Sequence, residues 1–153
     1  MENDMTIKER NRMSEWVEDI WNMHNKFGVH EWFAKQVKEN NTEVISQYLN
    51  FRLTMIYEEL GETFSAALVQ NDPEEVVDGL IDLCVFAIGT LDVFGIDIDE
   101  AWTRVHRANM MKEAGEKPER PNPFGLPDMI KLDGWEAPHH DDNIGALDIG
   151  LGR

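Results

Sequence analysis

The sequence predicts an all-α protein, a bundle of four to five helices with a loop-rich C-terminal extension. Apolar residues recur at helical spacing through most of the chain up to Ala114. Five of the six prolines and six of the eleven glycines lie after Glu113. We therefore expect a helical domain over residues 1–115. Residues 116–153 are expected to form an extension that packs on the bundle or on a neighbouring subunit.

The first helices are predicted from their apolar stripes and their end signals. The first stripe consists of Trp16, Ile20, Met23 and Phe27. Gly28 is a typical helix stop, because glycine readily adopts the left-handed conformation that ends helices. A short helix is expected over residues 31–38. Thr42 is the expected N-cap of a long helix that reaches about Gln70.

The turn Asn71-Asp72-Pro73 marks the start of the next helix. Asp72 suits the N-cap, and Pro73 suits the first helical position because no N–H is needed there. This helix is expected to end at Gly95. Its half after Asp82 is apolar nearly all round, which predicts burial, for example in a subunit interface.

The end of the chain is predicted less sharply. A further helix, capped by Asp97 or Asp99, is expected to end near Ala114-Gly115. The last fifteen residues, from His139 onward, carry little pattern, which is typical of disorder.

Composition limits the partners and the compartment. The net charge of −16 argues against a nucleic-acid or anionic-membrane surface. No apolar run approaches the roughly 20 residues that span a bilayer, and the first residues lack a signal-peptide pattern. The single cysteine, Cys84, excludes an intrachain disulfide. We expect a cytoplasmic protein that binds neither nucleic acid nor membrane.

Two short acidic runs dominate the helical part. Glu58, Glu59 and Glu62 fall within about a third of one helix's circumference, and Glu75, Asp78 and Asp82 share a narrower arc of the next helix. Unpaired carboxylates on facing stripes repel one another. A hard divalent cation neutralises them best, because Mg²⁺ and Ca²⁺ prefer oxygen ligands.

This spacing, Glu-Glu-x-x-Glu followed after a linker by Glu-x-x-Asp, resembles the signature of the all-α nucleoside triphosphate pyrophosphohydrolases. That superfamily includes MazG proteins, dimeric dUTPases and phosphoribosyl-ATP pyrophosphohydrolase. The stretches 77–83 and 105–112 are similar to a MazG-type variant of phages, so the compartment would be the host cytoplasm if the protein is phage-encoded. The resemblance covers roughly Ile45 to Pro138.

One departure from the superfamily pattern leaves the metal pair open. In many MazG proteins two aliphatic residues follow the final aspartate, which aligns that aspartate with Asp82 rather than Asp78. The glutamate expected three residues earlier would then be Gly79. The second helix could therefore supply Glu75 and Asp78, or Asp78 and Asp82.

The resemblance implies metal-dependent hydrolysis of a nucleoside triphosphate to the monophosphate and pyrophosphate, by attack of water on the α-phosphorus. Mg²⁺ is the expected ion, with Mn²⁺ as an alternative. The leading metal ligands are Glu59, Glu62 and Asp78, and Glu75 and Asp82 compete for a further place. Glu58 is the candidate for water activation, because it is offset from Glu59 by about 100°. The resemblance also implies homodimers or homotetramers.

Substrate contacts are expected from cations and an aromatic residue in the C-terminal half. Arg107, Asn109 and Lys112 match the pattern His-Arg-x-Asn-Met-x-Lys of the phage variant, which implies contacts with phosphate or sugar. Lys131 is expected to reach the phosphates from the C-terminal segment. Trp135, or an N-terminal aromatic residue such as Trp32, is a candidate for stacking on the base.

Other functions remain open from the sequence. The substrate could be dUTP, a modified nucleotide or phosphoribosyl-ATP, and a phage context favours deoxynucleotides. A different class of function is a non-catalytic acidic helical protein that binds a host partner. Metal dependence separates these classes, because only the enzyme requires the cation.

Overall fold

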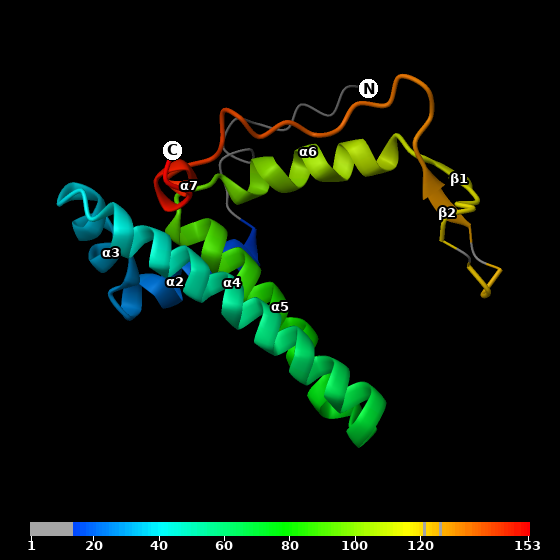
Figure 1. Cartoon of the computed structure of the whole chain (residues 1–153), viewed down its shortest axis with the longest axis horizontal. Coiled ribbons are helices and arrows are strands. Elements are labelled where there is room, and N and C mark those ends of the chain that lie inside the picture. The colour runs from blue at the N-terminus through cyan, green and yellow to red at the C-terminus, as the bar shows by residue number, and fades with distance from the viewer. Residues whose placement is uncertain (1–13, 121, 126) are drawn as a thin grey trace. The chain divides into compact units, whose positions relative to one another are not determined.

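Helices dominate the computed structural model, which describes residues 14–120, 122–125 and 127–153 (Figure 1). The predicted all-α class is confirmed, since the sheet consists of two short strands. Contacts group the chain into two compact units. Among the described residues, one unit holds residues 14–98 together with Ile144–Arg153, and the other holds the described part of Asp99–Asn143. The domain boundary expected at residue 115 stays a prediction, and the two units are described separately below.

The first unit begins with two helices. α2 spans Glu15–Lys26 and α3 spans Val29–Lys38. Gly28 separates them with a φ of 72°, so the predicted stop is confirmed. α3 begins two residues before the predicted start, because Gly28 also serves as its N-cap.

The long pair of helices comes next. α4 spans Thr42–Ser65 and continues as a π-helical turn, η1, over Ala66–Gln70. Its N-cap is Asn41, so the prediction of Thr42 as cap is wrong by one residue. α5 spans Pro73–Val93, and the carboxylate of Asp72 accepts hydrogen bonds from the backbone N–H groups of Glu74 and Glu75, at 3.1 and 3.2 Å. That predicted start is confirmed.

α4 and α5 pack side by side in antiparallel directions (Figure 1). Gly79 of α5 lies against Thr63 of α4, and Gly89 lies against Arg52. Arg52 is buried, and its guanidinium donates to the Thr90 hydroxyl at 3.2 Å and to the Phe86 carbonyl at 3.1 Å. These bonds satisfy a buried charge and fix the relative register of the two helices.

The core of this unit lies at the end where α2 and α3 meet the hairpin. Ile45, Leu49, Phe33 and Phe94 are buried there, and the Phe33 and Phe94 rings pack edge to face at 4.9 Å. The short helix α7, Leu147–Gly150, closes this core. The Ala146 N–H donates to the Phe94 carbonyl at 2.8 Å, and Gly150 is buried. The expectation of a disordered tail is therefore wrong for this segment.

The second unit contains α6, Ile98–Met110, apart from its first residue, together with the antiparallel strands β1, Glu113–Gly115, and β2, Asp128–Ile130. The prediction that the helix continues to Ala114-Gly115 is wrong, because those residues pair with β2. A Cβ at Gly115 would clash with the Ile130 side chain, so glycine permits this close pairing. The Arg104 guanidinium ties α6 to Asp142.

Within the described residues, no single helix is both long and apolar enough to cross a bilayer, and α5 and α6 meet that test only together, as a bent pair.

Candidate functional site

Five of the six predicted acidic residues form one group on the α4–α5 hairpin. Partial burial raises the pKa of Glu59, and the nearby carboxylates raise it further; in decreasing order these are Asp82, Glu62, Asp78 and Glu75. We call these five residues the carboxylate cluster. The antiparallel packing of α4 on α5 produces it, because it turns the acidic stripes of the two helices toward each other.

At Gly79 the two helices approach each other closely beside the cluster. A Cβ at this position would collide with the Thr63 hydroxyl and would lie 3.3 Å from a Glu59 carboxylate oxygen. The Thr63 hydroxyl is itself held by the Glu59 backbone carbonyl at 2.8 Å. A glutamate at position 79 would therefore not fit.

The donor set of the cluster fits a hard divalent cation. All five side chains offer carboxylate oxygens, which Mg²⁺ prefers. Glu59 and Asp82 are half-buried, whereas the other three are exposed, so the cluster opens to solvent and to a substrate. The mutual repulsion that raises the Glu59 pKa is the electrostatic condition that a bound cation relieves.

Glu58 lies one residue before the most crowded carboxylate. Its side chain is exposed, and its position is offset by about 100° around the α4 axis from Glu59. This arrangement leaves its carboxylate less committed to the cluster than that of Glu59.

Four of the five predicted substrate-binding residues meet in the second unit. The Lys112 ammonium donates to the Asn109 side-chain carbonyl at 2.8 Å. The Trp135 indole N–H donates to the backbone carbonyl of Ala108 at 2.7 Å. Lys131 joins them, because its ammonium lies 4.6 Å from the centre of the Trp135 ring. Arg107, the fifth residue, is exposed on α6.

The Trp135 ring carries two lysines. The ammonium of Lys112 lies 5.3 Å from the ring centre and that of Lys131 lies 4.6 Å from it. Both distances are within the range of cation–π attraction. The ring thus holds two positive charges close together. This arrangement suits an anion, such as a phosphate group, better than a neutral nucleobase.

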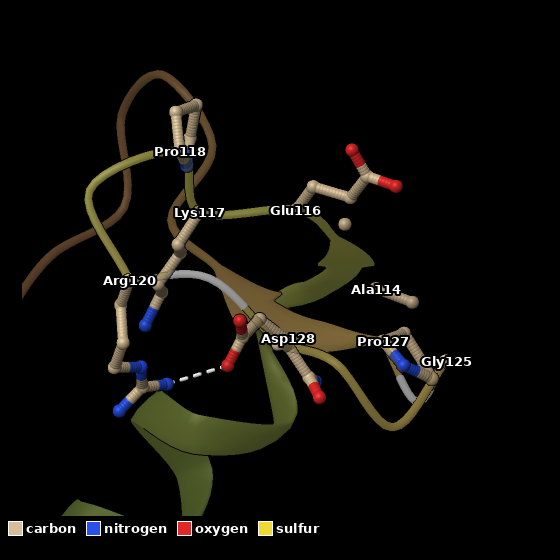
Figure 2. A pocket seen from close by; sticks show the side chains of 10 residues that line it. Ala114, Glu116, Lys117, Pro118, Arg120, Gly125, Pro127 and Asp128 are labelled. Carbon is tan, nitrogen blue, oxygen red and sulfur yellow. Dashed lines mark hydrogen bonds and ion pairs between the residues drawn. The ribbon is translucent and has the colours of Figure 1, made fainter.

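A separate cavity of about 590 Å³ lies between the strands and the loop of the second unit. Figure 2 shows Lys117, Arg120 and Asp128 at its wall, with Arg120 paired to the Asp128 carboxylate. None of the residues predicted as site residues lines this cavity.

Sequence reasoning missed a second polar group in the first unit. His24 of α2, His30 of α3 and Asp92 of α5 each offer a ligand atom, and these atoms lie within 4.8 Å of one another. Asp92 lies 68 positions after His24 and 62 positions after His30, so no local spacing in the sequence indicates this group.

Comparison with known proteins gives one family match. The model of a family described as phosphoribosyl-ATP pyrophosphohydrolase matches residues 28–109, just over half of the chain. The matched range contains α3, α4, α5 and most of α6, and with them the whole carboxylate cluster. No curated protein and no solved structure gives a significant match.

Proposed function

Because the chain belongs to the phosphoribosyl-ATP pyrophosphohydrolase family of the MazG-like all-α superfamily, we propose that it hydrolyses nucleoside triphosphates to the monophosphate and pyrophosphate with Mg²⁺. Family membership indicates a nucleotide pyrophosphohydrolase. The observation that carries the proposal further is the carboxylate cluster, because carboxylates of two helices lie close enough to Glu59 to raise its pKa.

We assign the cation to Glu59, Glu62, Asp78 and Asp82, with Glu75 at the margin. Asp82 acts on the Glu59 charge more strongly than the other carboxylates do, and Glu75 acts least among the four. This order supports the pair Asp78 and Asp82 over the pair Glu75 and Asp78. When bound, the cation neutralises the cluster and polarises the phosphoryl oxygens of the substrate.

The chain's own residues would perform the remaining steps. Glu58 would take a proton from the attacking water, whose oxygen forms a bond to the α-phosphorus. The bond between the α-phosphorus and the bridging oxygen of the β-phosphate breaks, and pyrophosphate leaves with that oxygen. Lys112 and Lys131, held on Trp135 in the second unit, are proposed to bind phosphate groups of the substrate.

A homo-oligomer completes the proposal. The hairpin exposes large apolar side chains at Tyr57, Phe64, Leu80 and Ile81, on both helices that carry the cluster. Large apolar side chains exposed to this extent are typical of a protein–protein interface. We propose a dimer or a tetramer in which a second copy covers these side chains.

The test is a substrate panel with product analysis. The purified protein is incubated with each NTP, each dNTP and dUTP, with Mg²⁺, with Mn²⁺ and with chelator. Metal-dependent release of monophosphate and pyrophosphate supports the proposal. Diphosphate and orthophosphate would instead contradict attack at the α-phosphorus. The ranking of dNTPs over NTPs tests the deoxynucleotide preference that the likeness of residues 105–112 to a phage variant supports.

Phosphoribosyl-ATP is the second candidate substrate, because the description of the matching family names it. It carries the same triphosphate, so the cluster would act on it by the same chemistry. Its inclusion in the panel distinguishes the two, since the preferred substrate has the higher kcat/KM. Lack of turnover on all of these substrates would favour the non-catalytic binding protein.

A further inference from the structure

Asp92 joins three helices through one carboxylate oxygen. His24 Nδ1 and His30 Nε2 each lie 2.7 Å from Asp92 Oδ2. The two imidazole rings meet edge to face, with their centres 5.8 Å apart. The three side chains come from α2, α3 and α5, so their convergence is a product of the tertiary fold and not of a local turn.

This group is largely withdrawn from solvent. The side chains of His24 and Asp92 are 6% and 8% exposed, and that of His30 is 25% exposed. A buried carboxylate requires a compensating partner. The ion pairs of Asp92 in the described residues are the two with histidine. Arg52, which lies near His24, directs its donors to Thr90 and Phe86 instead.

Two imidazole nitrogens and one carboxylate oxygen are the donor set of a borderline transition metal. Zn²⁺ binds histidine nitrogen at about 2.0–2.1 Å and carboxylate oxygen at about 2.0–2.2 Å. Tetrahedral ligands at those bond lengths lie roughly 3.3 Å apart. The present 2.7 Å separations need to widen by only a few tenths of an ångström at each atom. Mg²⁺ fits poorly, because it prefers oxygen ligands and keeps its waters.

We propose that His24, His30 and Asp92 form a Zn²⁺ site, separate from the carboxylate cluster, that fastens α2 and α3 to α5. Three protein ligands leave one coordination position for water, on the side where His30 reaches solvent. In the metal-free protein each ring directs an N–H at Asp92. When Zn²⁺ takes those nitrogens, it displaces the protons that face Asp92, and each zinc-bound ring carries its proton on the other nitrogen; a proton that finds this nitrogen occupied passes to solvent.

The site is tested by calorimetry, with Zn²⁺ as the only titrant. The buffer contains excess Mg²⁺, so that the carboxylate cluster is already saturated. The wild type is expected to bind one equivalent per chain. His30→Ala and Asp92→Asn are each expected to weaken binding by about tenfold or more, since each removes one of three ligands. His106→Ala, a change at an exposed histidine of α6, is the matched control and should bind as the wild type does.

A spectroscopic readout keeps the test independent of activity and of folding defects. Long-range ¹H–¹⁵N correlation spectra report the imidazole tautomers, and those of His24 and His30 should switch on addition of Zn²⁺. His30 is the more exposed ligand, so His30→Ala is expected to keep the native circular dichroism even if Asp92→Asn does not. Zn²⁺ binding by His30→Ala with wild-type affinity, or unchanged tautomers at saturation, would overturn the proposal. Because the carboxylate cluster is not measured, either result leaves the proposed hydrolase activity to its own test.

Discussion

The Thr63 hydroxyl of α4 occupies the space that any side chain at Gly79 of α5 would need. This contact sets the distance between the two helices at the level of Glu59, whose carboxylate lies directly beside it. The two helices can approach closely enough to combine their acidic stripes only because residue 79 is glycine. The spacing of the carboxylate cluster thus depends on a residue that carries no charge.

Gly79→Ala is expected to destabilise the protein by about 1–3 kcal/mol, since an added methyl group in a packed contact forces the backbone to shift. Thr63→Ala should restore part of the loss, because it removes the hydroxyl in the way. Denaturant titrations of the two single variants and the double variant measure this coupling.

Gly61→Ala is the matched control for that change. Gly61 also lies inside a helix, but a Cβ there meets nothing within 4 Å. This variant should be more stable than the wild type by roughly 0.5–1 kcal/mol, because alanine favours the helix. Equal effects at positions 61 and 79 would refute the close approach.

Glu59→Gln is expected to stabilise the protein in chelator at neutral pH. Folding raises the pKa of Glu59, because of burial and the surrounding carboxylates, so the charged form is less favourable in the folded state than in the unfolded state. The gain should be present above the raised pKa and disappear below the ordinary value of 4.5. The shift in Tm should amount to a few degrees at most, because solvent screens the charges.

The measurement is the Tm of both proteins as a function of pH, between pH 3 and pH 8, a range that includes the titration of carboxylates. We expect the Tm values of the two proteins to converge at the acid end. Added Mg²⁺ should raise the Tm of the wild type more than that of the variant, because Glu59 is a proposed ligand. A variant that is less stable than the wild type in chelator at pH 7 would contradict the clustering of these carboxylates.

Lys131→Ala is expected to lower kcat/KM by roughly 10- to 100-fold, the usual effect of losing a hydrogen bond to a charged group. Divalent-ion affinity should not change, since Lys131 is not a proposed ligand. Lys38→Ala, at the exposed end of α3, serves as the control and should leave kcat/KM unaltered. Steady-state kinetics and Mn²⁺ titration of the same preparations separate the two effects. A Lys131 variant with wild-type kinetics would contradict a phosphate-binding role for this residue.

The parts that the sequence predicted well depend on nearby residues. The stop at Gly28 and the start at Asp72 and Pro73 are local signals, and both are confirmed. The grouping of acidic residues follows from spacings of three and four residues on each helix, which bring side chains to one face. The antiparallel packing of α4 on α5, which brings the two faces together, does not follow from these local spacings.

The parts that escaped prediction depend on distant partners. α6 ends before Ala114 because residues 113–115 pair with β2, in a register that joins Glu113 to Ile130. The tail is ordered through Phe94, which accepts a hydrogen bond from Ala146. The group around Asp92 combines residues of three helices. None of these contacts leaves a periodic trace in the sequence.

The most direct test of the central claim compares Asp78→Asn with Glu74→Gln. Both residues are exposed acids near the start of α5, but only Asp78 belongs to the carboxylate cluster. Mn²⁺ binding is followed by electron paramagnetic resonance, and turnover of the preferred triphosphate is measured on the same samples. We predict that Asp78→Asn weakens Mn²⁺ binding and lowers turnover by about 100-fold, the effect of removing a group worth roughly 2.7 kcal/mol, whereas Glu74→Gln retains both. Wild-type Mn²⁺ affinity and turnover in Asp78→Asn would contradict the account.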